Sequence, residues 1–291
     1  MSTMTRRAAR VFTTACVISL LCPLFVALAP ADEGAWIPLF NGKNLDGWYT
    51  FLPTTGRNSD PKKFFKVEDG MIHILDLSED PNEWRGTVGY LATNQEYSDV
   101  RIHVEYKWGT KRFSRSIEGK RNSGLMYLVV GPDKMFPRSL ECQIEESDTG
   151  DLWLVDGTSI ATWLVDPYSS TYSDDPSAPG SKRVIGGPQI PASRVLKSGD
   201  FEDRNGWNTV EVILEGDRST HIINGRTVNR AWDIKQPDPQ DPAQMIPLKS
   251  GHIALEAEGS EIWFRNIRIK PLKPAGASAK SETPAPSVVK P

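Results

Sequence analysis

The feature that most constrains the fold is a run of strict alternation in the middle of the chain. Five apolar side chains occupy every second position there: Val100, Ile102, Val104, Tyr106 and Trp108. The positions between them are polar or charged: Arg101, His103, Glu105 and Lys107. A period of two is that of a β-strand with one buried and one wet face. We therefore expect a long amphipathic strand, with His103 as a surface histidine.

Shorter β-rich runs follow along the chain, separated by turn pairs such as Asp69-Gly70 and Asn224-Gly225. Helical periodicity is hard to find after the first 31 residues. This pattern predicts an all-β protein in which two antiparallel sheets form a sandwich or jelly roll. The core is predicted to include Val100, Ile102, Val104, Val210, Val212, Leu214, Ile253 and Leu255.

The N-terminus has the pattern of an export signal. Arginines precede an apolar run at 11–28, and Ala29-Pro30-Ala31 follows it. We interpret residues 1–31 as a secretory signal peptide, which predicts a periplasmic or secreted protein. A retained membrane anchor is the alternative, but a spanning helix needs about 20 apolar residues and Pro23 interrupts this run.

The remaining chain fits one domain, predicted at 36–272. Within it, residues 166–204 are rich in Pro, Gly and Ser and are interpreted as a loop insertion. Residues 273–291 are Pro, Ala, Ser and Lys with little to bury and are predicted to be a disordered tail. Cleavage would leave Cys142 as the only cysteine, so no intramolecular disulfide is expected. The net charge of −3 argues against a nucleic-acid partner.

A second alternating strand, at 139–145, carries the candidate chemistry. Leu140, Cys142 and Ile144 would face the core, which places Glu141, Gln143 and Glu145 together on the other face. Such side chains are roughly 6.5–7 Å apart for each two-residue step. The strand at 125–130 is its plausible neighbour and would bring Asn122 beside it. A row of two carboxylates and an amide indicates either a sugar-binding cleft or a solvated strand face.

Motifs along nearly the whole mature chain resemble a known family. In order they are LFNGKNLDGW (39–48), VEDG (67–70), LAT (91–93), NSG (122–124), ECQI (141–144), TG (149–150), GWN (206–208), HIING (221–225), GHIAL (251–255) and FRNIRI (264–269). This order is similar to that of the 3-keto-disaccharide hydrolase domain, also described as a 3-keto-glucoside 1,2-lyase and 3-keto-2-hydroxy-glucal hydratase domain. The resemblance implies a concanavalin A-like jelly roll of two curved antiparallel sheets. It also implies activity on an oxidised sugar or glycan.

Three departures from the family pattern bear on the site. Glu145, Glu146 and Asp148 compete for the place of an acidic residue after the ECQI run. Glu256 stands where Gln is usual. The 166–204 insertion exceeds the family's minimal form, so substrate contacts along that rim do not transfer.

The chemistry on a 3-keto-glycoside would be removal of the C2 proton followed by elimination or hydration. That reaction needs a base, an acid for the departing oxygen and a donor at the enolate oxygen. We expect Glu145 as the base and Glu141 as the acid, with His221 as a less favoured catalytic candidate because its turn context favours a structural role. The predicted substrate-binding residues are Asn122, Gln143, Asp148 and Trp153. The sequence points to no particular cofactor, and a divalent metal at the enolate oxygen stays open.

Two other functions stay open. One is a non-catalytic, lectin-like carbohydrate-binding module, because the same polar and aromatic face would serve it. The other is a laminarinase-type glycoside hydrolase, because the strand at 141–145 resembles the Glu-x-Asp-x-Glu strand of those enzymes. In an unbulged strand Glu141 and Glu145 are roughly 13 Å apart, whereas retaining hydrolysis needs about 5–5.5 Å. Hydrolysis by this pair is therefore the weaker hypothesis. No membrane span is expected after signal cleavage.

Overall fold

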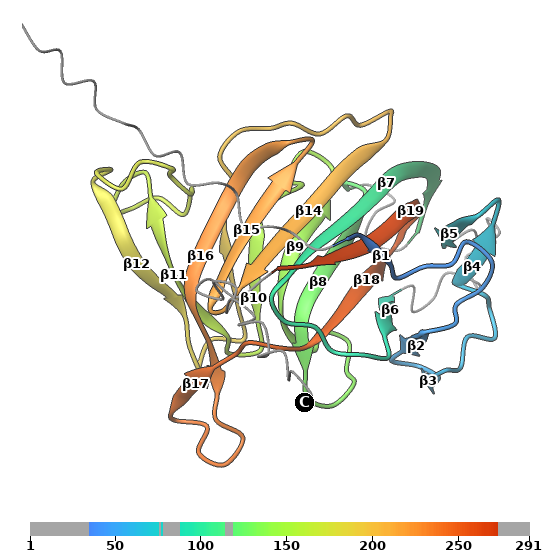
Figure 1. The fold of residues 1–291 in the computed structure, drawn as a ribbon, viewed down its shortest axis with the longest axis horizontal. Helices are drawn as coiled ribbons and strands as arrows, with labels where there is room; N and C mark the ends of the chain where they lie inside the picture. The colour runs from blue at the N-terminus through green and yellow to red at the C-terminus, as the bar shows by residue number, and fades with distance from the viewer. Residues whose placement is uncertain (1–34, 76, 78–87, 114–118, 273–291) are drawn as a thin grey trace, which may run out of the picture. The chain divides into compact units, whose positions relative to one another are not determined.

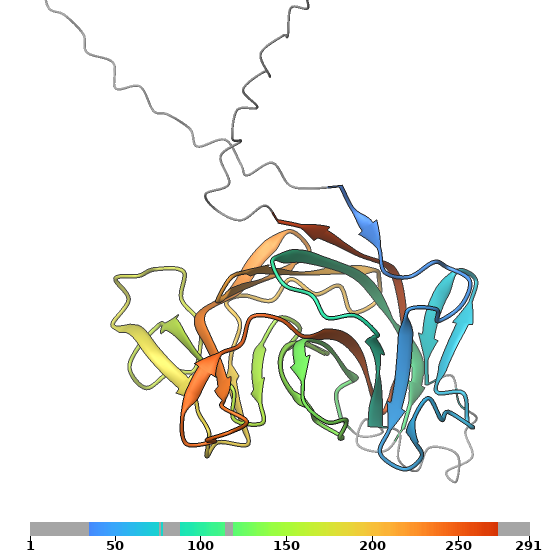
Figure 2. The same ribbon diagram turned by 60° about the horizontal axis from the view of Figure 1, so that its bottom comes forward.

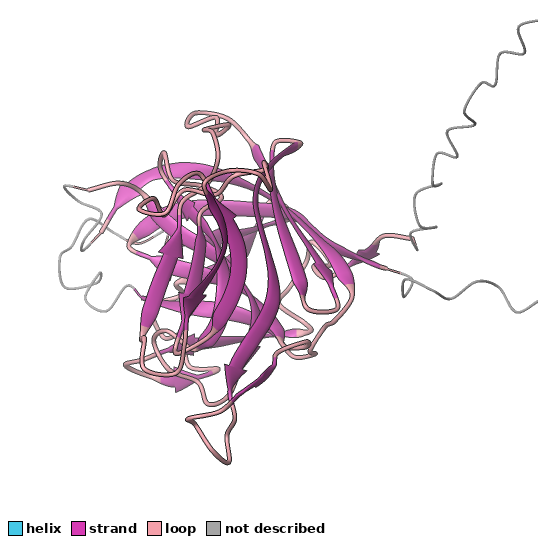
Figure 3. Cartoon of the chain, turned by 90° about the vertical axis from the view of Figure 1, so that its left-hand side faces the viewer, coloured by secondary structure: helices cyan, strands magenta, loops and turns pink. Residues whose placement is uncertain are grey.

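The computed structural model describes residues 35–75, 77, 88–113 and 119–272. In these ranges every regular element is a β-strand, as Figure 3 shows. The predicted signal peptide and C-terminal tail lie outside the described residues. The described part contains no helix long and apolar enough to cross a membrane.

The larger sheet has eleven strands in the described part of the chain (Figure 1). Its order is β12 (Gly180–Gly186), β11 (Ser159–Leu164), β16 (Arg226–Pro237), β15 (Arg218–Ile223), β14 (Asn208–Glu215), β7 (Val100–Arg112), β19 (Ser260–Pro271), β5 (Met71–Ile74) and β4 (Phe65–Glu68). Two short strands attach to this path: β1 (Ile37–Pro38) pairs with β19, and β17 (Met245–Pro247) pairs with β16.

The smaller sheet has eight strands in the same described ranges. Its order is β13 (Ala192–Val195), β10 (Leu152–Val155), β9 (Arg138–Glu145), β8 (Asn122–Val130), β18 (His252–Glu258), β6 (Val88–Thr93), β2 (Trp48–Leu52) and β3 (Gly56–Arg57). The strands of both sheets pair antiparallel throughout the described ranges. Figure 2 shows β7 and β19 of the larger sheet arching over the strands of the smaller sheet. The prediction of an all-β jelly-roll sandwich is confirmed.

The core lies between the two sheets and follows the predicted alternation. The eight core residues expected from the sequence are all buried and belong to one apolar cluster: Val100, Ile102, Val104, Val210, Val212, Leu214, Ile253 and Leu255. The apolar side chains of β9, Leu140, Cys142 and Ile144, enter the same cluster. Because neighbouring side chains of a strand alternate, the intervening residues of β9 point away from the core.

Two of the predicted turn pairs close hairpins in the expected way. Asp69-Gly70 joins β4 to β5, and Asn224-Gly225 joins β15 to β16. Both residues of each pair have positive φ, between 48° and 77°. That backbone is the type I′ turn, for which Asp-Gly and Asn-Gly are the preferred pairs.

Two expectations from the sequence need correction. Residues 166–204, predicted as a loop insertion, contain β12 and β13, which extend the two sheets at one edge. His103 is on the outward face of β7 but is only 8% exposed, because the Trp36 ring packs edge-on against it at 5.5 Å and Glu211 bonds its Nδ1 at 3.1 Å. The alternation within β7 carried no information about these two distant residues.

Candidate active site

The predicted polar row lies on the face of the smaller sheet that is turned away from the core. β9 and β8 pair without a register shift from Asn122↔Glu145 to Tyr127↔Leu140, so β9 has no bulge between Glu141 and Glu145. On the other side of β8, β18 brings Glu256 and Glu258 level with this row. Three adjacent strands therefore contribute one continuous polar patch. We call it the acidic row, and it consists of Asn122, Glu141, Gln143, Glu145, Glu256 and Glu258.

A close pair of carboxyl groups occupies the centre of the acidic row. Glu141 and Glu256 approach each other over Gly124, where an added Cβ would overlap oxygens of both. A side chain at this position would displace the two carboxyl groups. Glu141 is only 7% exposed and Glu256 only 3%. Both carboxyl groups are largely removed from water.

Burial is the main reason why the pKa of Glu141 is raised well above its ordinary value, and the negative charge of Glu258 adds to the shift. A hydrogen bond with Glu256 acts in the opposite direction by stabilising the Glu141 carboxylate. Glu141 Oε1 is buried and has no hydrogen-bond partner among the described residues. This carboxyl group is suited to hold its proton to a higher pH than an ordinary glutamate does and to donate it.

Two side-chain amides, those of Gln143 and Asn122, lie beside this carboxyl pair in the acidic row. Gln143 donates from Nε2 to Asn122 Oδ1 at 3.0 Å, and Asn122 donates from Nδ2 to Glu258 Oε2 at 2.5 Å. The backbone N–H of Asn122 is held by the Ser260 hydroxyl at 3.0 Å. This chain of bonds fixes both amide orientations, as a group that recognises sugar hydroxyls requires.

Glu145 ends the row in a different environment. Its side chain is 21% exposed, and its Oε2 lies 3.5 Å from Arg194 Nη2. Burial, followed by the hydrogen bond and charge of Asp148, raises the pKa of Glu145, while Arg194 opposes the shift. Lys120, 2.6 Å from Asp148, and Arg194 overcome the effect of burial on Asp148 and lower its pKa. Of the two neighbouring carboxyl groups, Glu145 is thus the more basic.

Arg194 connects the acidic row to its edge strand. It is in β13, paired opposite Trp153 of β10, which is in turn paired opposite Glu141. Its guanidinium contacts Asp148 at 2.8 Å and Asp151 at 2.6 Å, and it lies 5.2 Å from the centre of the Trp153 ring. The site therefore has a fixed cation beside Glu145. The same guanidinium lies over one face of the Trp153 ring.

An aromatic cluster continues the same face on the other side. Tyr90 of β6 is paired opposite Glu256, and Tyr49 of β2 lies in the next strand. Tyr90 donates to Asp133 Oδ1 at 2.7 Å, and the Arg57 guanidinium lies 3.5 Å from the centre of the Tyr49 ring. The acidic row is bordered by an aromatic residue at each end of the sheet, Trp153 and Tyr49.

Six of the seven predicted site residues are brought together here: Glu141, Gln143, Glu145, Asn122, Asp148 and Trp153. His221 is not among them, because it lies between the sheets and is 1% exposed. The Gly150 carbonyl, 3.1 Å away, can only accept, so Nδ1 carries the proton and Nε2 accepts from the Tyr127 hydroxyl at 2.8 Å. Burial lowers the pKa of His221 to about 4. A catalytic role for His221 does not agree with this position.

Four members of the site were not predicted from the sequence. The signal for Glu256 and Glu258 is their alternation with the core residues Ile253 and Leu255, which places them on the outer face. Lys120 and Arg194 had no comparable signal. Arg194 reaches the site only because β13 pairs with β10.

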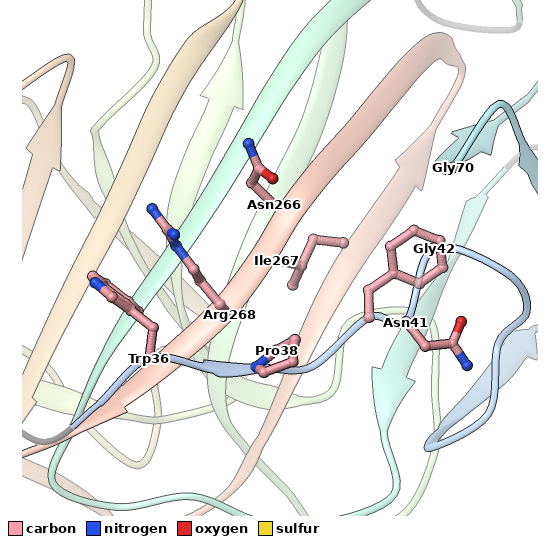
Figure 4. Close-up of a pocket in the computed structure, with 9 residues that line it drawn as sticks. Trp36, Pro38, Asn41, Gly42, Gly70, Asn266, Ile267 and Arg268 are labelled. Atoms are coloured by element: carbon pink, nitrogen blue, oxygen red, sulfur yellow. The ribbon is translucent and has the colours of Figure 1, made fainter.

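A pocket of about 420 Å³ lies elsewhere, on the outer face of the larger sheet (Figure 4). Trp36, Asn41, Asn266 and Arg268 contribute its polar and aromatic lining, and the Arg268 guanidinium lies 4.6 Å from the centre of the Trp36 ring. No carboxylate is among its described lining residues. Proton transfer chemistry is therefore better placed at the acidic row. In the described ranges, no group of three or more His, Cys, Asp or Glu side chains is arranged to hold a metal ion.

Comparison with known proteins gave several similarities. The chain is 23% identical over 263 residues to a 3-keto-disaccharide hydrolase of Bacteroides thetaiotaomicron, which covers 84% of this chain and 80% of that protein. A protein structure from Parabacteroides distasonis, assigned to the glycosyl hydrolases, has 21% identity and a TM-score of 0.48, and covers 82% of this chain and 94% of the other. A β-glucanase of Bacillus licheniformis has 13% identity and a TM-score of 0.43, over 82% of this chain and 99% of the other.

The family comparison covers most of the chain. A model of the 3-keto-alpha-glucoside-1,2-lyase-like domain matches residues 35–270, which include every described strand except the last residue of β19. The motifs that carried the resemblance in the sequence all lie in this range. The chain belongs to the 3-keto-alpha-glucoside-1,2-lyase-like domain family.

Proposed function

We propose that this protein is an exported enzyme that cleaves 3-keto-glycosides by removing the C2 proton and eliminating the substituent at C1. The observation that carries the proposal is the pair of outward carboxyl groups on β9, Glu145 and Glu141, which have raised pKa values in unlike surroundings. Groups of this kind can divide the roles of base and acid. Family membership and the name of the Bacteroides relative support the same substrate class.

The proposed reaction assigns a role to each group. A ketone at C3 acidifies the C2 hydrogen, and Glu145 accepts that proton. Arg194, 3.5 Å from Glu145, supplies positive charge for the enolate oxygen. The electron pair then forms the C1=C2 bond as the C1–O bond breaks, and a water molecule between Glu141 and the substrate passes a proton from Glu141 to the departing oxygen. Water addition to the resulting enone completes a net hydrolysis.

Binding is assigned to the remaining residues of the row. Asn122 and Gln143 have fixed amide orientations and would bond sugar hydroxyls. Trp153 would stack on a sugar ring with the face that Arg194 does not cover. Asp148 would act through its bonds to Lys120 and Arg194, which set the charge around Glu145.

The structure also bears on the glycoside hydrolase alternative. Without a bulge, Glu141 and Glu145 stay roughly 13 Å apart along β9. That separation is larger than the arrangement that direct hydrolysis of an unoxidised glycoside requires.

The proposal is tested by incubating the purified protein with a 3-keto-glucoside and with the matching unoxidised glucoside, each with and without chelator. We expect turnover of the 3-keto substrate alone, and the chelator arm shows whether a divalent metal takes part. Cleavage of the unoxidised glucoside would favour the hydrolase alternative. Glycan binding without any turnover would favour the lectin-like module.

Export is a separate part of the proposal, supported by the 1–31 pattern. Mass spectrometry of the protein recovered from its native host should give a mature chain that begins near Asp32 and contains one thiol, from Cys142. Recovery of the intact 1–31 segment would contradict it.

A further inference from the structure

A second pocket, of about 510 Å³, lies on the outer face of the larger sheet. Its walls come from β11, β14, β15 and β16, four strands that lie side by side in Figure 1. Val210, Val212 and Leu214 of β14 enter the core, so the lining residues Ile213 and Glu215 point outward. The core therefore separates this pocket from the acidic row, which is on the outer face of the other sheet.

Two tryptophans form one side of the pocket. Trp163 of β11 and Trp232 of β16 are partly exposed, and their ring centres are 4.7 Å apart with the planes inclined at 59°. Two tryptophans that directly precede strands of this sheet are covered by cations: Arg265 lies 3.7 Å from the centre of the Trp207 ring, and Arg268 lies 4.6 Å from that of Trp36. Among the described residues, no cation lies over Trp163 or Trp232. The partly exposed faces of these two rings are therefore available to a ligand.

Hydrogen-bonding groups surround the two rings. Thr220, Arg218, Arg230 and Glu215 line the same pocket. Each arginine of the lining has a carboxylate beside it: Asp174 is 2.7 Å from Arg230, and Asp217 is 3.8 Å from Arg218. The pocket thus presents donors and acceptors without a net positive charge that would select an anion.

We propose that this pocket is a non-catalytic binding site for a neutral glycan. The apolar C–H face of a pyranose ring would stack on the Trp163–Trp232 pair, while Thr220, Arg218 and Glu215 bond its hydroxyls. A volume of about 510 Å³ is within the range of pockets that bind small ligands. Glu215 is the only carboxylate among the lining residues, so the pocket has no acid–base pair of its own. The site would hold a polymer on one face of the sandwich and leave the acidic row free.

The test is electrophoresis in native gels that contain dextran, mixed-linkage β-glucan or polygalacturonate. We expect at least one of the two neutral glucans to retard the wild-type protein, and polygalacturonate to retard it no more strongly. Trp163→Ala and Trp232→Ala should each weaken that binding roughly two- to tenfold, as the loss of one aromatic contact predicts. Thr220→Tyr should do the same by filling the pocket while both tryptophans stay.

Matched variants show whether the glycan binds at this pocket or elsewhere on the protein. Trp207→Ala removes a cation-covered tryptophan beside the same sheet and should keep the wild-type retardation. Trp153→Ala removes the aromatic residue of the acidic row and reports on glycan binding there. Thermal midpoints confirm that each variant is folded. The proposal is overturned if neither neutral glucan retards the wild type, if polygalacturonate retards it more strongly, or if only Trp153→Ala abolishes retardation. Retardation needs no turnover, so this result is separate from the test of the proposed enzyme.

Discussion

At the scale of single residues, the acidic row divides binding from chemistry. Asn122 and Gln143 bond each other and have no proton to exchange at neutral pH. Replacing either by Ala should raise KM for a 3-keto-glucoside more than it lowers kcat, because the lost contact is made in the ground state and the transition state alike. Steady-state kinetics measures both constants. A fall in kcat with unchanged KM would contradict the binding assignment.

Glu141 should make the fold less stable at neutral pH. Its pKa is raised in the folded protein, so the folded state holds the proton more tightly than the unfolded state does. Stability contributed by this proton is fully present below the unfolded pKa and is lost as pH rises toward the folded pKa. Glu141→Gln, which removes the titration, should therefore unfold at a higher temperature than wild type at neutral pH. The difference should shrink as pH falls toward about 4.5 and be absent below it.

Thermal melts of both proteins across this pH range provide the measurement. Glu146→Gln is a suitable control, because the pKa of Glu146 is lowered by its bonds to Arg121 despite partial burial, and its removal should have the opposite sign. A Glu141→Gln protein that is less stable than wild type at neutral pH would contradict the buried, proton-holding role.

Residue identities on β9 could be predicted because alternation alone decides which side chains leave the core. The same rule placed Asn122, since its strand is the neighbour of β9. It failed for His221, whose place in the core depends on the Tyr127 hydroxyl and the Gly150 carbonyl. A histidine whose two ring nitrogens are both hydrogen-bonded inside the core cannot be recognised as buried from the sequence of its own strand.

At the scale of secondary-structure elements, β13 is the part that the sequence did not reveal. Only Val195 of its four residues is buried, so the strand lacks the alternation that marks β7 and β9. It exists because β10 offers an edge with which to pair. An edge strand of this kind is specified by the strand with which it pairs. Because β13 lies in a segment rich in Pro and Gly, its sequence predicts a loop.

The placement of Arg194 by β13 leads to a prediction on pH dependence. The Arg194 charge opposes the rise in the pKa of Glu145. Glu145 must be ionised to accept a proton, so activity falls as pH drops below its pKa. Arg194→Gln raises that pKa further and should move the acid limb of the kcat/KM profile to higher pH, in addition to lowering kcat.

Arg183→Gln is the matched control for this experiment. Arg183 is an exposed arginine on β12 that donates to the Pro167 carbonyl, and it has no contact with the acidic row. Its profile should coincide with that of wild type. An acid limb that stays in place in Arg194→Gln would show that Arg194 does not act on the base.

At the scale of the whole molecule, stability depends on the core between the sheets. Val104 of β7 and Val212 of β14 are fully buried in it. Replacing either by Ala removes two methyl groups and should cost roughly 1–3 kcal/mol of unfolding free energy. Denaturant unfolding measures this loss. A variant with an unchanged midpoint would show that its strand does not face the core as described.

The two-sheet architecture was predictable apart from its edge strands β12 and β13, because each long strand repeats the same inward alternation and because Asp-Gly and Asn-Gly pairs fix the hairpins. The site was predictable in part. Contacts along β9 follow from one strand, whereas Glu256 and Arg194 come from strands 115 and 53 positions away in the sequence from Glu141. Only the pairing of β18 and β13 into the smaller sheet brings them to it.

The central claim is that Glu145 removes the C2 proton of a 3-keto sugar, and hydrogen exchange at that carbon tests it most directly. A 3-keto-glucoside is incubated in deuterated water with wild type, Glu145→Gln and the Glu146→Gln control, and NMR follows the C2 hydrogen of the substrate and its products. We expect wild type and Glu146→Gln to replace it with deuterium or eliminate it at equal rates. The Glu145→Gln rate should be about 10²–10⁴ lower, with an unchanged thermal midpoint. Wild-type rates in Glu145→Gln would contradict the claim.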